Sequence, residues 1–152
     1  MEAKIYAEMC GLLSQFLAEK KLRRTEERFT ILERICAFPG HFDIDMLYHD
    51  LEQANFHVSR ATIYNTLDVL LEAGLIVRHQ WMTKSAVQYE LKIHADTHMH
   101  LICTRCGVVR EIRNSSLNES LGALKIARFT PESYCLYVYG ICSKCKYKMR
   151  MR

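Results

Sequence analysis

The first half of the chain carries apolar side chains at the spacing of amphipathic helices. They recur every three or four positions, which places them on one face of a helix, in the segments 5–20, 26–37, 44–51 and 59–74. Thr25, Asp43 and Ser59 stand where the second, third and fourth segments would begin, and their side chains suit an N-cap. Gly74 suits the end of the fourth segment. Helices are therefore predicted up to this glycine.

The pattern changes from helix to strand directly after Gly74. LIVRHQW and AVQYEL resemble two short strands joined by the polar turn MTKS. Helices followed by a hairpin are typical of the winged helix-turn-helix, in which the last helix lies in the DNA major groove. Five side chains at the start of this helix lie off its apolar stripe and would face the bases: Ser59, Arg60, Thr62, Tyr64 and Asn65. The pattern alone also allows a helical interaction module without a DNA role.

Strand patterns return after the polar link KIHADTHM. Strands are predicted at HLIC, VVREI and SYCLYVYGIC, with a helix at SSLNESLGALKIARF between the last two. The second half is therefore a small α+β arrangement. The ending KCKYKMRMR is expected to be a solvated basic tail.

Length and charge add limits to this picture. A chain of 152 residues can bury about 70% of its unfolded surface, so it needs no disulfide scaffold. The net charge of +4 is modest, and the basic excess lies in residues 94–152, with 10 basic against 4 acidic side chains. No apolar run approaches the length of a membrane span, and no signal-peptide pattern opens the chain. A cytoplasmic protein with reduced thiols is expected.

Four of the seven cysteines form two Cys-x-x-Cys pairs, Cys103 with Cys106 and Cys142 with Cys145. Each pair can present two thiolates to one ion, and four thiolates complete the tetrahedral shell of a structural zinc site. Such a closed site leaves no position for a substrate, so we expect it to tie the end of the last strand to the start of the first. Thiol redox chemistry is the alternative, but neither pair opens a helix in a thioredoxin-like unit.

Five stretches together resemble the ferric uptake regulator (Fur) family of bacterial metal-responsive repressors: LRRTEERFTIL, GHFDIDMLYHDL, VSRATIYNTLDVLLEAGLI, HLICTRCGVVREI and LYVYGIC. The resemblance implies a homodimer that binds palindromic operators in double-stranded DNA. It also implies an α+β fold, with an N-terminal winged helix-turn-helix domain followed by a small α/β dimerisation domain. The expected boundaries are 1–91 for the DNA-binding domain, 92–99 for a hinge and 100–152 for the dimerisation and zinc-binding domain.

The resemblance further implies a regulatory metal site at the domain junction, formed by His41, Glu90, His100 and Glu111. His98 is an additional candidate, because two residues of separation place it on the same side of a strand as His100. Imidazole and carboxylate ligands suit Fe(II), Mn(II) or Zn(II) and do not select among the three. One ion bound by the set would fix the angle between the domains and thereby switch DNA binding.

The chain departs from the family pattern at a second regulatory site. The family has an aspartate, an acidic helix residue and a strand histidine at three positions of this site. This chain has Met99, Asn118 and Tyr134 there. We predict that this second site is absent or altered.

The DNA contacts implied by the resemblance are kept in part. Tyr64 matches the tyrosine that the family places against bases, where its ring can meet a thymine methyl. Asn65 replaces the arginine that usually follows it, and Arg23 matches a basic residue used in the minor groove.

The predicted function is a metal-responsive transcriptional repressor concerned with iron or haem homeostasis, and not an enzyme. Peroxide-, zinc- and haem-responsive regulators are alternatives within the family. A zinc enzyme would need an open site with three ligands and a general base, and HLICTRC lacks the pattern of a nucleobase deaminase. A zinc-stabilised interaction module without DNA activity is the alternative of another class, favoured by the slightly acidic first half and by Asn65.

Overall fold

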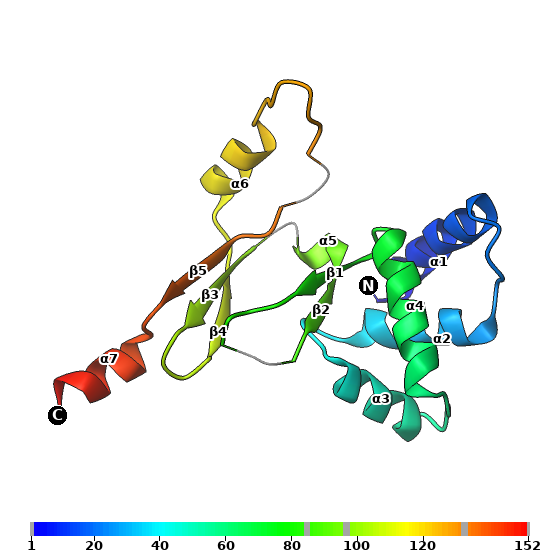
Figure 1. Ribbon diagram of the computed structural model, residues 1–152, viewed down its shortest axis with the longest axis horizontal. Helices are drawn as coiled ribbons and strands as arrows, with labels where there is room; N and C mark the ends of the chain where they lie inside the picture. The colour runs from blue at the N-terminus through cyan, green and yellow to red at the C-terminus, as the bar shows by residue number, and fades with distance from the viewer. Residues whose placement is uncertain (1, 84–85, 96–97, 132–133, 152) are drawn as a thin grey trace. The chain divides into compact units, whose positions relative to one another are not determined.

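The computed structural model describes residues 2–83, 86–95, 98–131 and 134–151. The chain divides into two compact units, Met1–Gln80 with Ala86–Lys92 and Trp81–Ser85 with Ile93–Arg152. Each unit contains its own small sheet (Figure 1). The expected α+β fold, with helices and a hairpin first and a small mixed unit second, is confirmed. None of the described helices is long and apolar enough to cross a membrane.

The first unit contains four helices and a hairpin. Its elements are α1 (Glu2–Glu19), α2 (Glu26–Ala37), α3 (Ile44–Gln53), α4 (Arg60–Glu72), β1 (Ile76–His79) and β2 (Gln88–Leu91). The strands pair antiparallel, with Ile76 opposite Leu91 and His79 opposite Gln88. Each helix contributes fully buried side chains to one core, as predicted from the apolar periodicity: Leu13, Leu32, Leu47 and Leu67 are examples. This core holds the last helix and the hairpin in place.

Two of the three predicted N-caps are confirmed as side-chain caps. Asp43 and Ser59 each accept a hydrogen bond from the backbone N–H three residues later, at 2.8 and 3.1 Å. Thr25 stands at the N-cap of α2, but its side chain makes no capping hydrogen bond. Gly74 follows α4 with a φ of 67°, a left-handed conformation that glycine adopts without steric cost. Local sequence signals thus set the starts of α3 and α4 and the end of α4.

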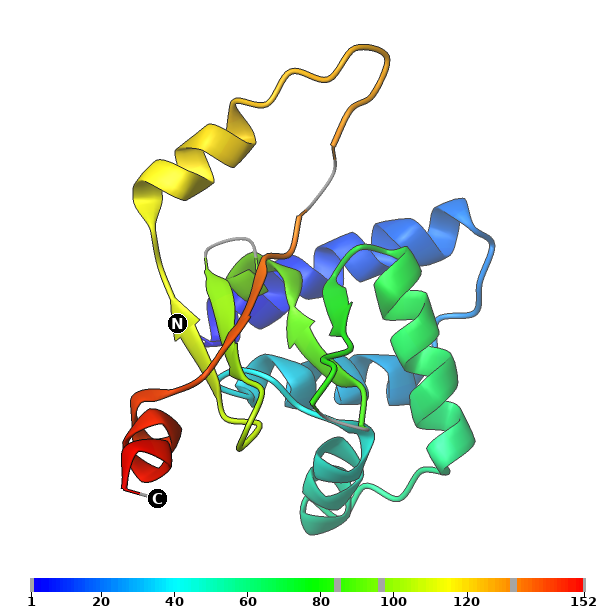
Figure 2. The same cartoon turned by 60° about the vertical axis from the view of Figure 1, so that its left-hand side comes forward.

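The second unit is a three-stranded sheet with short helices around it (Figure 2). Its elements are α5 (Lys92–Ala95), β3 (Met99–Cys103), β4 (Val109–Ile112), α6 (Ser115–Gly122), β5 (Tyr137–Gly140) and α7 (Ser143–Arg150). The central strand β3 pairs antiparallel with β4 and parallel with β5. His100 therefore lies opposite Glu111 on one side and Tyr137 on the other.

Several boundaries differ from the sequence prediction. The helix predicted for residues 115–129 ends at Gly122, and Ile126 then pairs with Phe129 in a tight turn; glycine is a poor helix former, which favours an end there. The basic ending, expected to be a solvated tail, forms the helix α7, which contains no buried residue. Residues 84–85 of the predicted turn and 96–97 of the predicted hinge lie outside the described residues.

Replacing Asp43 by alanine should lower the free energy of unfolding by about 1 kcal/mol, because α3 loses its side-chain cap. Gln88 Nε2 also donates to Asp43 at 3.3 Å, so the loss of this contact adds to the effect. Thr25→Ala is the matched control, since Thr25 makes no capping bond to α2 and should cost less. Urea unfolding followed by circular dichroism measures both variants, and equal losses would contradict the capping role of Asp43.

Candidate metal centres and nucleic-acid interface

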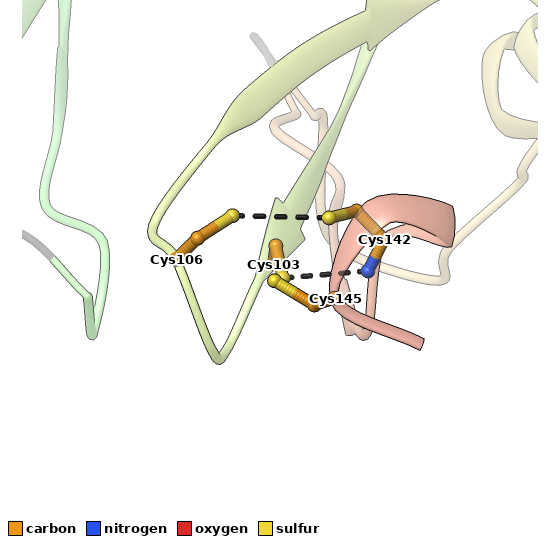
Figure 3. A group of neighbouring side chains, drawn as sticks. All are labelled: Cys103, Cys106, Cys142 and Cys145. Carbon is orange, nitrogen blue, oxygen red and sulfur yellow. Dashed lines mark hydrogen bonds between the residues drawn. The ribbon is translucent and has the colours of Figure 1, made fainter. Parts of the chain in front are cut away.

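Four thiols gather where β3 and β5 end in the second unit (Figure 3). Cys103 ends β3, Cys106 lies in the turn to β4, and Cys142 and Cys145 lie at the start of α7. All four sulfur atoms lie within 4.8 Å of one another, and those of Cys106 and Cys142 are 3.8 Å apart. Four sulfurs bonded at about 2.3 Å to one tetrahedral zinc ion would be about 3.8 Å apart. The cluster therefore fits a structural zinc ion.

The thiol cluster joins different strand ends from those expected. The sequence interpretation tied the end of the last strand to the start of the first, which requires antiparallel neighbours. Because β3 and β5 are parallel, their carboxyl ends lie at the same edge of the sheet, and both thiol pairs follow these ends. Thr104 N–H also donates to the carbonyl oxygen of Gly140 at 2.8 Å. The cluster thus fastens two strand ends that already lie side by side.

Backbone donors prepare Cys103 to act as a thiolate. The N–H of Cys142 donates to Cys103 Sγ at 3.3 Å, and together with the N–H groups of Cys106 and Arg105 it lowers the pKa of Cys103 to about 6. Hydrogen bonds with Cys106 and Cys142 instead raise the pKa of Cys145 to about 12. The four-thiol cluster thus retains protons near neutral pH, and these protons must be released when a metal ion binds.

In the first unit, two histidines converge on one buried carboxylate. Nε2 of His41 lies 3.2 Å from Oε2 of Glu90, and Nε2 of His79 lies 3.1 Å from the same oxygen. The Glu90 side chain is only 1% exposed. Phe42 and Tyr89 exchange two backbone hydrogen bonds of 2.9 and 2.7 Å, which brings His41 beside β2. The predicted pair of His41 and Glu90 is therefore brought together within this unit.

His79 was not among the sequence-predicted ligands. It lies on β1 opposite Gln88, two ladder steps from the pair of Val77 and Glu90, so both side chains are on the same face of the hairpin. The alternation of side chains along β1 predicts that His79 lies on one face of the hairpin. Its distance from Glu90, however, depends on the register between β1 and β2. Because the length of a hairpin turn sets that register, periodicity alone did not reveal it.

In the second unit, His98, His100 and Glu111 lie together at the start of the sheet. Nε2 of His98 is 3.2 Å from Nε2 of His100 and 3.9 Å from Oε2 of Glu111. The rings of Trp81 and Tyr137 lie beside the His100 ring, with centroid distances of 5.7 and 5.6 Å. Two imidazole nitrogens this close can share one proton or bind one cation. The predicted ligands His98, His100 and Glu111 are thus neighbours within this unit.

The positions of the family's second regulatory site lie on different segments of the second unit. Met99 is a buried residue of β3, Asn118 lies on α6, and Tyr134 precedes β5. The absence or alteration of that site stays a prediction.

The predicted DNA-contact residues lie at or near the surface of the first unit. Tyr64 is 51% exposed, and Asn65 and Arg23 are also exposed. The hydroxyl groups of Ser59 and Thr62 lie 2.9 Å apart and take part in the cap of α4. These two hydroxyl groups are therefore less available for hydrogen bonds with DNA bases.

Arg60 lies at the first position of α4 and is held by two residues of α3. Its Nη1 donates to Asp45 at 2.6 Å, and its guanidinium lies 4.7 Å from the centroid of the Tyr48 ring. These contacts orient the side chain at the exposed start of the helix. The role of this surface in DNA binding stays a prediction.

Comparisons with known proteins place the whole arrangement among bacterial regulators. The chain is 36% identical over 136 residues to the ferric uptake regulation protein of Neisseria meningitidis serogroup A, which covers 87% of this chain and 92% of that protein. It is 30% identical over 133 residues to the peroxide operon regulator of Bacillus subtilis, which covers 87% and 90% of the two chains.

Solved structures show the same fold. The Helicobacter pylori ferric uptake regulator superposes with a TM-score of 0.71 at 18% identity, covering 93% of both chains. The Vibrio cholerae ferric uptake regulator superposes with a TM-score of 0.60 at 28% identity, covering 84% of this chain and 98% of the other. Members of this family are metal-responsive transcription regulators rather than enzymes, and they bind DNA as dimers. Because residues 19–139 match the model of the Ferric uptake regulator family, this chain belongs to that family.

Proposed function

We propose that this chain is a metal-responsive transcriptional repressor that binds palindromic operator DNA as a homodimer. The observation that carries the proposal is the buried Glu90 carboxylate at the base of the hairpin, with two imidazole nitrogens within 3.2 Å. Burying a carboxylate is costly unless a partner of suitable charge or hydrogen bonding is present. A cation is such a partner, and a set of oxygen and nitrogen ligands is suitable for a divalent metal ion.

The proposed regulatory site combines ligands from both units. His41 and Glu90 come from the winged-helix unit, and His98, His100 and Glu111 from the second unit. When bound, the cation supplies the positive charge that holds these groups to a common centre. This would fix the angle between the units and set the separation of the two recognition helices in the dimer, which must match half-sites about one DNA turn apart. Metal and DNA would then each strengthen the binding of the other by the same factor.

The effector proposed for this site is Fe(II), with Mn(II) or Zn(II) as competitors for the same ligands. A related regulator from Francisella tularensis has been solved with iron, at 26% identity and a TM-score of 0.59. One from Pseudomonas aeruginosa has been solved with manganese. We therefore propose that the genes under its control serve iron or haem homeostasis.

A peroxide-responsive regulator is the second candidate, favoured by the similarity to the Bacillus subtilis peroxide operon regulator. Histidine and carboxylate ligands around Fe(II) can be oxidised in such a protein. Loss of promoter binding when the iron-loaded protein meets peroxide, with no such loss in the manganese-loaded protein, would favour this candidate.

Apolar surface on the second unit supports the proposal of a homodimer. A hollow of about 340 Å³ there is lined in part by Leu101, Val108, Val138 and Ile141, and the last three of these side chains are at least 40% exposed. Exposed apolar patches favour association with another surface. Because most oligomers are symmetric homodimers, a second copy of the chain is the proposed occupant.

We expect Cys106→Ser to remove the proposed structural zinc ion and to destabilise the second unit, since ion binding then no longer contributes folding energy. Zinc content measured by mass spectrometry should fall by about one ion per chain, because three thiolates leave the tetrahedral shell incomplete. Cys135→Ser is the matched control, because Cys135 is an exposed cysteine of the same unit outside the cluster. A Cys106→Ser protein with full zinc content would refute the structural site.

His100→Ala should weaken metal-dependent promoter binding by about tenfold or more, in line with the loss of a positioned metal-site residue. The fold and the dimer should remain, as judged by circular dichroism and sedimentation. Gel-shift titrations with fragments of the protein's natural promoters, across Fe(II), Mn(II) and Zn(II), measure the effect, with His49→Ala as the surface control. Unchanged metal dependence would remove His100 from the switch.

Tyr64→Ala should lower the affinity for specific promoter DNA by about tenfold, because a base contact is worth about 1–3 kcal/mol. The salt dependence of binding should change little, since a tyrosine neutralises no phosphate. Tyr147→Ala removes a similarly exposed tyrosine from the other unit and serves as the control. Equal affinity of Tyr64→Ala and the parent protein would place the recognition surface elsewhere.

A further inference from the structure

We propose that His79 is a positioning residue of the regulatory metal site. Its Nε2–H donates a hydrogen bond to Glu90 and keeps the carboxylate oriented when His41 exchanges its proton for the metal ion. This inference rests on the metal-dependent function proposed above. It assigns a separate task to each of the two histidines that approach Glu90.

The hairpin holds His79 and Glu90 in a fixed relation. His79 pairs with Gln88 across the ladder and Val77 pairs with Glu90, so the two side chains are diagonal neighbours on paired strands. The His79 side chain is fully buried, at 0% exposure, whereas His41 keeps 13%. Ladder hydrogen bonds and burial leave His79 little freedom to move away from the carboxylate.

The protons on the two imidazoles explain the division of tasks. An ionised carboxylate only accepts hydrogen bonds, so each ring nitrogen that bonds to Glu90 must carry a proton. A nitrogen that binds a metal ion must give this proton up. His41 therefore cannot bind an ion through Nε2 and still donate to Glu90 through that atom. When His41 turns to the ion, the contact between its Nε2 and Glu90 is lost.

His79 then keeps its own hydrogen bond to the buried carboxylate. A carboxylate oxygen has more than one acceptor site, so Oε2 of Glu90 can accept from His79 while the carboxylate also binds a cation. Ligating carboxylates are commonly held by such hydrogen bonds, and loss of the supporting group typically lowers metal affinity 10–100-fold. The 3.1 Å contact of His79 has the length required for this role.

The test compares two substitutions of His79 in the full-length, zinc-containing protein. His79→Leu removes the donor and keeps an apolar side chain of moderate size, whereas His79→Gln retains an N–H donor. Co(II) is the probe, and its visible absorption reports both affinity and coordination number. We expect His79→Leu to bind Co(II) about 10–100-fold more weakly than the parent protein, and His79→Gln to recover most of the affinity.

The matched control is His57→Leu, which breaks a surface pair of histidine and glutamate. His57 Nδ1 lies 2.9 Å from Oε1 of Glu52, and the His57 side chain is 70% exposed. This variant should bind Co(II) as the parent does. A second measurement needs no variant: nitrogen-15 NMR of the parent should show a proton on His79 Nε2 both before and after addition of Zn(II).

Three results would overturn the positioning role. Loss of the His79 Nε2 proton on metal addition, or equal loss of affinity in both variants, would make His79 a ligand. Parent-like affinity in His79→Leu would leave His79 with a packing role only. His41→Ala separates the two proposals, because unchanged Co(II) binding in that variant would refute the regulatory site itself, whatever His79 does.

Discussion

Burial of the Glu90 carboxylate is the constraint on which the winged-helix unit depends most. The side chain is almost inaccessible to solvent and lies on the second strand of the hairpin. Hydrogen-bond donors of the protein or a bound cation must therefore replace the water that would otherwise solvate the carboxylate. His41 reaches it because Phe42 and Tyr89 pair as an isolated bridge, and His79 reaches it because of the hairpin register. The loop before α3, the hairpin and the candidate ligands therefore form one arrangement, and a shift in any of them would disturb the others.

The second unit must be stabilised in a different way, because its described residues include few buried apolar side chains. The extensive buried core lies in the first unit, whereas the helices α6 and α7 contain no buried residue. Four thiols beside the ends of β3 and β5 offer cross-links through a metal ion in place of a large apolar core. The lowered pKa of Cys103 fits this use, since backbone N–H groups stabilise the negative sulfur before an ion arrives.

Features encoded by neighbouring residues were predictable from the sequence. The bounds of α2, the caps Asp43 and Ser59, the turn at Gly74 and both thiol pairs follow from spacings of a few residues. Features that depend on distant pairing were not. The parallel pairing of β3 with β5 changed which strand ends the thiols join, and the nearness of His79 to Glu90 required the hairpin register. The end of α6 was also misplaced, because apolar periodicity continues past Gly122 while the helix does not.

The Arg60 contacts at the start of α4 have a consequence for electrostatics. This guanidinium already has a carboxylate partner in Asp45 and an aromatic one in Tyr48. The bond to Asp45 uses one of the five N–H donors of Arg60, so a phosphate that contacts the remaining donors meets a guanidinium whose charge a carboxylate already balances. Such an arginine releases fewer condensed ions from a polyanion than a solvated one would. Asp45 would thus weaken the non-specific attraction between this helix end and a polyanion.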